Sequence, residues 1–386
     1  MIYPVVGLCF LVFTCYIGCR VLMPLFALKL SASEVQIGAL MAMYAVFPLA
    51  LSIHAGRVAD RAGSYRPVLY GLIGYAVGLV LPVFMPTMTG LYLSAALSGL
   101  SLVFFGVATQ NLISSIGDAN ARKHNVSVYS IGLALSSFAG PMFTGYLIDH
   151  HGHLTTYAVL SGLCAAGALG WFAYRRHVPR VSRPAATATI AGVVELVRNR
   201  PLREIVIVSG IVVAGVDLFA FYMPIYGHSI NLSATAIGAI LGAQAIASLV
   251  VRGFMPLILK RYREENVLAA AMALAAFAFV LTPFFSTFAM LVTISFLLGL
   301  GLGCGQPLSL LLVFNRSPAG RSGEALGVRS AVINVMHLMI PLTFGAVSAL
   351  LGLIPVFLVN AGLMAGGGYL SYRGGKESAK AHTKAH

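Results

Sequence analysis

The sequence is poor in charged residues for its length, and poorest in acids. Only 9% of its 386 residues are charged, with 11 Asp and Glu in all, whereas 59% are hydrophobic. A soluble chain of this size would have too little polar surface to cover its exterior. The mean hydropathy of +0.89 therefore excludes an ordinary soluble protein and indicates a chain whose solvent is the lipid bilayer.

The sequence also lacks the patterns of metal and catalytic sites. Its five cysteines form no CxxC pair and all fall in apolar runs, where they are interpreted as small packing residues. His150, His151 and His153 cluster between two such runs, where a solvated turn is favoured over a weak metal site. Outside the apolar runs we find neither a nucleophile elbow nor a phosphate-binding glycine loop. We therefore expect no catalytic residues, no metal and no cofactor, and we do not expect an enzyme.

What the sequence does contain is a series of long apolar runs, each near the length of about 20 residues that spans a bilayer as a helix. The runs cover residues 3–28, 36–57, 67–88, 90–115, 125–148, 154–174, 204–228, 235–258, 266–284, 287–313, 325–349 and 352–372. They predict an all-α membrane protein with twelve transmembrane helices. The first run has no basic leader and no small-residue cleavage site, so we interpret it as a true span rather than a signal peptide.

Basic residues follow every second run. These residues lie within 57–66, 122–123, 175–203, 260–263, 316–321 and 373–384, all on one side of the predicted membrane. The connections on the other side carry only Lys29. Basic loops are retained in the cytoplasm, so we expect both termini there, in a multi-pass protein of a bacterial-type inner (plasma) membrane. The net charge of +14 is then explained by topology and by contact with anionic membrane lipid, and no nucleic-acid partner is expected.

The two halves of the sequence match at an offset of 200 residues. Prolines are scarce, yet Pro24 pairs with Pro224 and Pro141 with Pro341, each in corresponding runs. The further matches are Gly38 with Gly238, Arg61 with Arg261, Gly99 with Gly299 and Gly145 with Gly345. The repeat predicts two pseudo-symmetric six-helix bundles.

We place the N-terminal bundle at residues 1–174, a cytoplasmic linker at 175–203, the C-terminal bundle at 204–372 and a cytoplasmic tail at 373–386. Within the linker, Thr189 to Leu196 are expected to form a short surface helix. Two parallel bundles related by an axis along the membrane normal can expose a central site to each side in turn. This architecture predicts a secondary transporter that works by alternating access on a small-molecule substrate.

The segment Gly56-Arg57-Val58-Ala59-Asp60-Arg61-Ala62-Gly63-Ser64-Tyr65-Arg66 resembles the loop 2-3 signature of the major facilitator superfamily, G-x-x-x-D-R-x-G-R-R. Ser64-Tyr65 depart from the two basic residues common there, and the second-half stretch Pro256 to Tyr262 keeps Arg261 but has Lys260 in place of the acid. The resemblance implies a monomer.

In physical terms, an ion pair from this loop can hold the bundles together when the cavity faces outward. The residues to which we assign this gating role are Gly56, Asp60, Arg61, Gly63 and Arg66. The alternative is a solvated turn that only enforces topology.

The fifth run carries a second pattern. Gly132, Ser136, Gly140 and Thr144 recur every four residues and form a small-residue face, while Gly140-Pro141 interrupts the backbone hydrogen bonds. The stretch from Gly132 to Gly145 resembles the helix 5 motif of the proton-coupled drug exporters in the superfamily. The resemblance implies a gating role for Gly140, Pro141 and Gly145, and it favours export.

Charges deep in apolar runs are costly and persist where they face a partner, a cavity or a substrate. Asp217 is the sole acid deep in any run, and Arg20 lies in the first. Asp217 corresponds to Ile17 in the repeat, one turn from Arg20 on nearly the same face. Because helices 1 and 7 line the cavity in the superfamily, we hypothesise that Asp217 binds the proton while Arg20 sets its pKa or holds an anionic part of the substrate. A static ion pair is the alternative.

Other polar residues in the runs are weaker candidates for proton or substrate binding, because each can simply bond a neighbouring helix. They are Tyr16, Gln110, Asn111, Tyr222, Gln244, Gln306, Asn334 and His337. Many proton-coupled exporters of the superfamily have an arginine before the glycine of helix 4, and none precedes Gly99 here. The favoured function is proton-coupled export of a small organic molecule. Uptake or facilitated exchange of a small organic anion, or lipid flipping, stays open.

Overall fold

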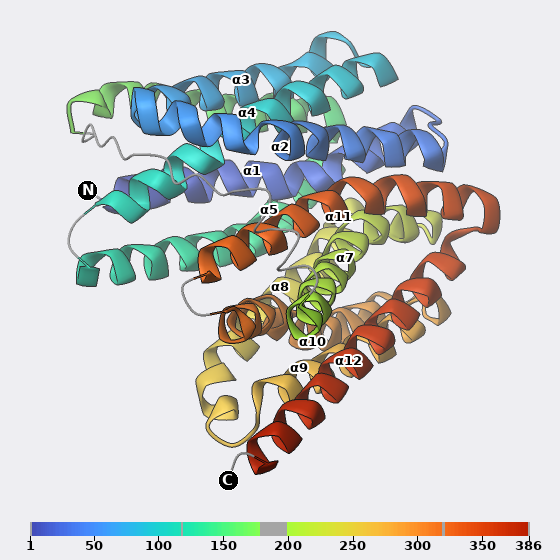
Figure 1. Ribbon diagram of the computed structural model, residues 1–386. Helices are drawn as coiled ribbons and strands as arrows, with labels where there is room; N and C mark the ends of the chain where they lie inside the picture. Colours follow the sequence, from blue (N-terminus) through green and yellow to red (C-terminus); the bar gives the residue numbers. More distant parts are fainter. Residues whose placement is uncertain (1, 117–118, 178–198, 319–320, 385–386) are drawn as a thin grey trace. The chain divides into compact units, whose positions relative to one another are not determined.

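The computed structural model describes residues 2–116, 119–177, 199–318 and 321–384, and every regular element within these ranges is a helix (Figure 1). The α-helices are α1 (Ile2–Lys29), α2 (Glu34–Ala62), α3 (Tyr65–Phe84), α4 (Met88–Ser115), α5 (Ala119–Ala173), α7 (Arg200–Ser229), α8 (Ala234–Leu259), α9 (Glu264–Leu281), α10 (Phe288–Arg316), α11 (Ser322–Leu351) and α12 (Leu353–Lys384). Short 3₁₀ helices η1 (Tyr174–His177) and η2 (Thr282–Phe284) follow α5 and α9.

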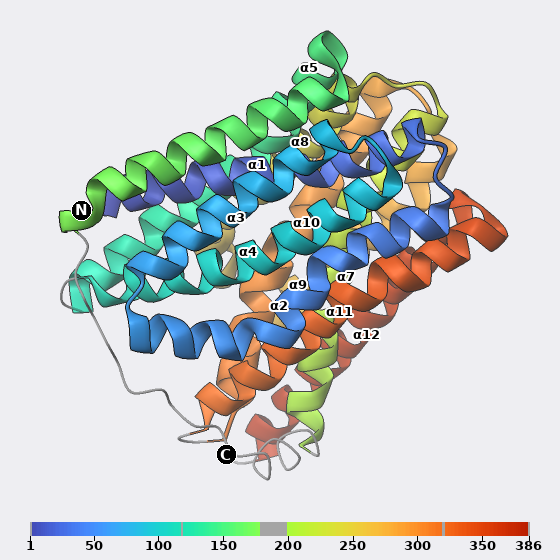
Figure 2. The same ribbon diagram turned by 90° about the horizontal axis from the view of Figure 1, so that it is seen from above.

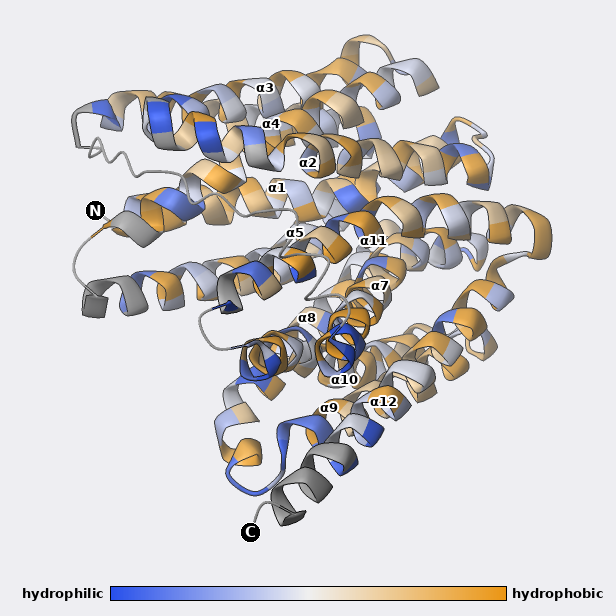
Figure 3. Cartoon of the chain, viewed as in Figure 1, coloured by the Kyte–Doolittle hydropathy of each residue, from blue (hydrophilic) through white to orange (hydrophobic). Residues whose placement is uncertain are grey.

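Eleven helices of the described ranges are long and apolar enough to cross a membrane. One of them, α5, has 55 residues and departs from helical geometry at Gly152 (φ 78°, ψ 171°), which divides it into two spans. The count of twelve transmembrane helices is thereby confirmed. Figure 3 shows apolar residues over most of the helix lengths, whereas the connection between α8 and α9 is hydrophilic. The chain is a multi-pass membrane protein.

The helix ends follow from local sequence. Ser33 caps α2 in a capping box with Gln36, and Thr87 accepts a hydrogen bond from the Gly90 amide at the start of α4. Gly63 ends α2 with a φ of 74°, a conformation that favours glycine. At the other end, α12 continues to Lys384 although the apolar run stops near residue 372. Helical hydrogen bonding can extend beyond the apolar length that crosses the bilayer.

The chain divides into two compact units. The first comprises Met1–Ala186 and Met223–Gly242, and the second comprises Thr187–Tyr222 and Ala243–His386. Most of the predicted linker, including the expected short helix from Thr189 to Leu196, lies outside the described residues.

In the first unit α1 packs against α5, and Figure 2 shows the later, green part of α5 running beside α1. A Cβ added to Gly132 would lie 3.0 Å from Val6 Cγ1, and one added to Gly140 would lie 2.7 Å from the Thr14 carbonyl oxygen. Between these glycines, the Ser136 hydroxyl donates to the Phe10 carbonyl at 3.0 Å. The small-residue face predicted on the fifth run is confirmed, and it permits close backbone approach to α1.

The 200-residue repeat is visible in matching contacts inside each unit. The Trp171 indole donates to the Tyr65 carbonyl at 3.1 Å, and the Ser371 hydroxyl donates to the Glu265 carbonyl at 3.3 Å. Likewise a Cβ on Gly99 would lie 2.6 Å from the Tyr44 carbonyl oxygen, while one on Gly299 would meet the carbonyl oxygen of Gln244. In each case the second contact is the first shifted by 200 residues, so the two halves share one helix register.

Candidate functional site

One buried acid of the second unit contacts a histidine. Asp217 on α7 is only 5% exposed, and its Oδ2 contacts Nδ1 of His337 on α11. The side chain of His337 is 40% exposed, so the pair is closed on the carboxylate side and reachable on the imidazole side. Both residues were predicted separately as candidates. The structure brings them together.

The contact depends on how α7 and α11 run along each other. A Cβ on Gly210 of α7 would lie 3.2 Å from Val332 and 3.4 Å from Met336, so the absence of a side chain lets α11 approach closely. The repeat makes this α7–α11 seam the counterpart of the α1–α5 seam. Ile17 and Ser137 stand at the positions equivalent to Asp217 and His337. The first unit therefore has no ionisable pair at the positions equivalent to Asp217 and His337.

Arg329 of α11 is a second polar element of the seam, and the sequence reading missed it. It is 8% exposed, and its Nε donates to the Ser209 hydroxyl of α7 at 3.3 Å. Its Nη2 donates to the Ser309 hydroxyl and the Gln306 carbonyl of α10 at 3.3 and 3.4 Å. One guanidinium therefore joins three helices of the second unit.

The other predicted residues of the second unit contact their neighbours mainly through backbone atoms or ring packing. Gln306 offers its backbone carbonyl to Arg329, and the Gln244 backbone lies against Gly299. Tyr222 is buried and packs edge-on against Phe221, with ring centroids 4.6 Å apart. Asn334 lies one turn before His337 on α11 and is partly exposed.

In the first unit, Tyr16 and Arg20 lie one turn apart on α1, and Tyr16 packs against Phe13 and Tyr44. Gln110 is exposed near the end of α4, and Asn111 beside it is half-buried. Arg20 and Asp217 belong to different units, so their pairing stays a prediction.

The predicted gating segment, residues 56–66, covers the last turns of α2 and the start of α3 rather than a loop, and it is only partly described. Gly63 ends the helix with a positive φ, which explains the second glycine of the pattern G-x-x-x-D-R-x-G-R-R without reference to gating. Arg61 and Arg66 are exposed, and Gly56 is half-buried within α2. The side chain of Asp60 lies outside the described part, so its predicted ion pair stays a prediction.

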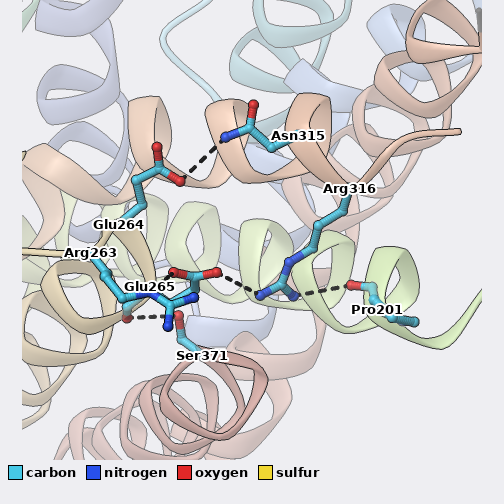
Figure 4. A network of polar contacts seen from close by, with 7 residues as sticks. All are labelled: Pro201, Arg263, Glu264, Glu265, Asn315, Arg316 and Ser371. Atoms are coloured by element: carbon cyan, nitrogen blue, oxygen red, sulfur yellow. Dashed lines mark hydrogen bonds and ion pairs between the residues drawn. The ribbon is translucent and has the colours of Figure 1, made fainter. Parts of the chain in front are cut away.

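The second unit has an ion-pair network at the corresponding place (Figure 4). Glu265 at the start of α9 is 7% exposed and pairs with Arg316 of α10 at 3.4 Å and with Arg263 at 3.8 Å. Arg316 also donates to the Pro201 carbonyl at 3.3 Å, and Asn315 donates to Glu264 at 3.3 Å. Glu265 lies five residues after Lys260, the position equivalent to Asp60, and is the acid that pairs with basic side chains in this segment.

Within the first unit, the predicted gating residues of α5 lie against the start of α8. Side chains are excluded on both helices here, since a Cβ on Gly145 would meet the Ala234 carbonyl oxygen and one on Gly238 would meet that of Pro141. Asp149 adds to the contact, because its carboxylate accepts hydrogen bonds from the backbone amides of Ala234 at 3.0 Å and Thr235 at 2.7 Å. An acid at a helix N-terminus satisfies two orphan amides and opposes the helix dipole.

Comparison with known proteins points to one family. The sequence matches the profile of the Major Facilitator Superfamily over residues 8–341 and again over 205–385. It is 19% identical over 360 residues to an uncharacterized MFS-type transporter of Methanocaldococcus jannaschii, covering 91% of this chain and 92% of that protein. It is 26% identical to the class C tetracycline resistance protein of Escherichia coli (81% and 80% covered) and 22% identical to the quinolone resistance protein NorA of Staphylococcus aureus (84% of each).

Solved structures share the fold. A variant of the peptide transporter POT in complex with sulfate matches with a TM-score of 0.81 at 16% identity, covering 96% of this chain and 93% of that one. A variant of the nucleoside transporter NupG matches with a TM-score of 0.80 at 15% identity, covering 97% and 99%. At these identities the likeness concerns the fold alone.

Proposed function

The chain belongs to the major facilitator superfamily and is a membrane transporter rather than an enzyme, and we propose that it exports a small organic molecule in exchange for protons by alternating access. The tetracycline and quinolone resistance proteins among its relatives support export, because removing a drug from the cell confers resistance to it. The small-residue face of α5 supports the same direction. Both termini are proposed to face the cytoplasm, on the side of the basic connections.

The Asp217–His337 pair is the observation that carries proton coupling. A carboxylate in an apolar setting is costly unless its charge is balanced, and here it contacts an imidazole, a side chain that can carry a proton and a positive charge. The pair can hold one proton more in one state of the transporter than in the other. Arg20 is proposed to bias this equilibrium or to hold an anionic part of the substrate.

The remaining predicted residues are assigned roles within this scheme. Gly56, Asp60, Arg61, Gly63 and Arg66 are proposed to close the cytoplasmic side. Gly140, Pro141 and Gly145 are proposed to close the opposite side through α8, supported by the close backbone approach. Asp149, which the sequence analysis did not single out, supports this contact through its two bonds to backbone amides.

The test uses inverted membrane vesicles with an acidified lumen and a fluorescent pH probe. Tetracycline, a quinolone and a set of aromatic carboxylates are added in turn. An exporter moves its substrate into the lumen and protons out, so the lumen becomes less acidic. We expect Asp217→Asn to abolish this response while preserving energy-independent exchange of labelled for unlabelled substrate, and His337→Asn to weaken the response.

Thr343→Val is the matched control, because Thr343 lies on the same helix as His337 but is exposed and bonds only its own helix. It should transport like the wild type. Uphill transport by Asp217→Asn in response to the proton gradient would show that the pair does not carry the coupling proton. Exchange without any response to the gradient in the wild type would identify a facilitator.

A further inference from the structure

Arg329 is a buried cation whose contacts in the described part of the chain are all neutral. Its three hydrogen bonds go to two serine hydroxyls and one backbone carbonyl. Ser209 and Ser309 are fully buried, and each hydroxyl donates to its own helix, Ser209 to Ile205 and Ser309 to Gln306. The serine lone pairs are thereby turned toward the guanidinium. Three helices hold this group in a fixed orientation.

A guanidinium cannot shed its charge by losing a proton, unlike a lysine or histidine in the same place. Among the residues that the structure describes, no Asp or Glu forms an ion pair with Arg329. A charge of this kind inside a membrane protein is costly without a counter-charge. The neutral contacts orient the cation, but they do not balance it.

The guanidinium also has donors to spare. Nε and Nη2 make the three bonds, while Nη1 has no partner among the described residues and is not sealed inside the protein. A planar guanidinium with a reachable amino edge is suited to a carboxylate or another oxyanion. Its counter-charge can therefore come from a bound molecule.

The place of Arg329 connects it to the proton-binding pair. Ser209 and Asp217 are eight residues apart on α7, and their partners Arg329 and His337 are eight residues apart on α11. Eight residues of helix rise about 12 Å. An anion at Arg329 would lie on the same seam as the pair, at a distance that a small organic molecule can span.

We propose that Arg329 is an anion-binding residue of the transporter and that the cargo carries a carboxylate or similar acidic group, which Nη1 binds while Ser209, Ser309 and Gln306 hold the guanidinium in place. This proposal rests on the transport function proposed above and specifies the chemical class of its substrate. A purely structural role, in which Arg329 only ties α7, α10 and α11 together, would give stability but no preference for anions.

The test is binding of carboxylates and of their uncharged amides. Purified protein is heated with a panel of aromatic and aliphatic carboxylates, each paired with its amide, and ligand affinity is taken from the concentration dependence of the shift in Tm. The wild type should prefer at least one carboxylate over its amide. In Arg329→Gln we expect the carboxylate to bind about 10- to 150-fold more weakly, the loss of a charged hydrogen bond, with the amide little changed. Arg329→Lys should retain part of the preference for the carboxylate, because lysine keeps the positive charge but lacks the paired N–H donors of a guanidinium.

Arg252→Gln is the control for loss of an arginine. Arg252 on α8 also donates its Nε to α10, at the Gly303 carbonyl at 3.0 Å, but is exposed. It should keep the wild-type preference. The proposal is overturned if no carboxylate is preferred by the wild type, or if Arg329→Lys and Arg329→Gln fold and keep the full preference. Binding needs no proton gradient, so an intact anion preference without gradient-driven transport would refute the coupling and leave Arg329 as the anion site.

Discussion

The close contact between α5 and α8 predicts that adding one methyl group at Gly238 will weaken the closed state that we propose for this side of the transporter. In Gly238→Ala the new Cβ would meet the Pro141 carbonyl oxygen and lie 2.9 Å from its carbon, both of them backbone atoms that cannot rotate away. Overpacking of this kind costs about 1–3 kcal/mol. Because about 1.4 kcal/mol is a factor of ten, the closed contact should become about 5- to 150-fold less favoured.

Hydrogen exchange reads this equilibrium directly. The amides of Ala234 and Thr235 are held by Asp149 only while α5 and α8 are in contact, so their exchange should accelerate in Gly238→Ala by a similar factor. Gly106→Ala is the matched control, because a Cβ there would meet nothing within 4 Å. If the variant folds and the peptide covering residues 233–240 exchanges at the wild-type rate, the backbone approach does not hold the two helices together.

Two further predictions concern single carboxylates. Asp149→Ala should lower the stability of the α5–α8 contact by about 1 kcal/mol through loss of the helix cap. Asp149→Asn should have a smaller effect, because asparagine also caps helices. Hydrogen exchange of the Ala234 and Thr235 amides measures both effects, and equal effects would argue against a capping role. Glu265→Gln should lower the free energy of unfolding in detergent by about 3 kcal/mol, because Arg316 and Glu265 have side chains only 12% and 10% exposed. Glu204→Gln, whose partner Arg200 is 53% exposed, should cost about 0.5 kcal/mol or less in the same measurement, and a similar loss in both variants would contradict the reasoning.

The parts of the fold that depend on local pattern could be predicted from sequence. The apolar runs determine the spans, since the backbone must bond within itself in lipid. The four-residue spacing of Gly132, Ser136, Gly140 and Thr144 also indicated a packing face, because small residues at that spacing share one side of a helix. Asp217 was identified by the cost of a charge in an apolar run.

The parts that depend on contacts between distant helices could not be predicted. Asp217 and His337 are 120 residues apart, and nothing in the sequence around His337 distinguishes it from other polar residues in spans. Arg329 stands four residues inside its predicted run and resembles the basic residues that mark topology. Glu265 and Asp149 stand one residue outside predicted runs, where acids are ordinary. Their roles depend on burial and on partners, which only the structure supplies.

The equal spacing of the two polar contacts on the α7–α11 seam has a mechanical consequence. Ser209–Arg329 and Asp217–His337 have the same sequence separation of 120 residues, like two rungs of one ladder. A translation or rotation of α11 relative to α7 would distort both contacts together, so a change that weakens one contact should also weaken the other. An anionic cargo at Arg329 and a proton at the Asp217–His337 pair would then both act on the relative position of α7 and α11, without a relay of intermediate residues.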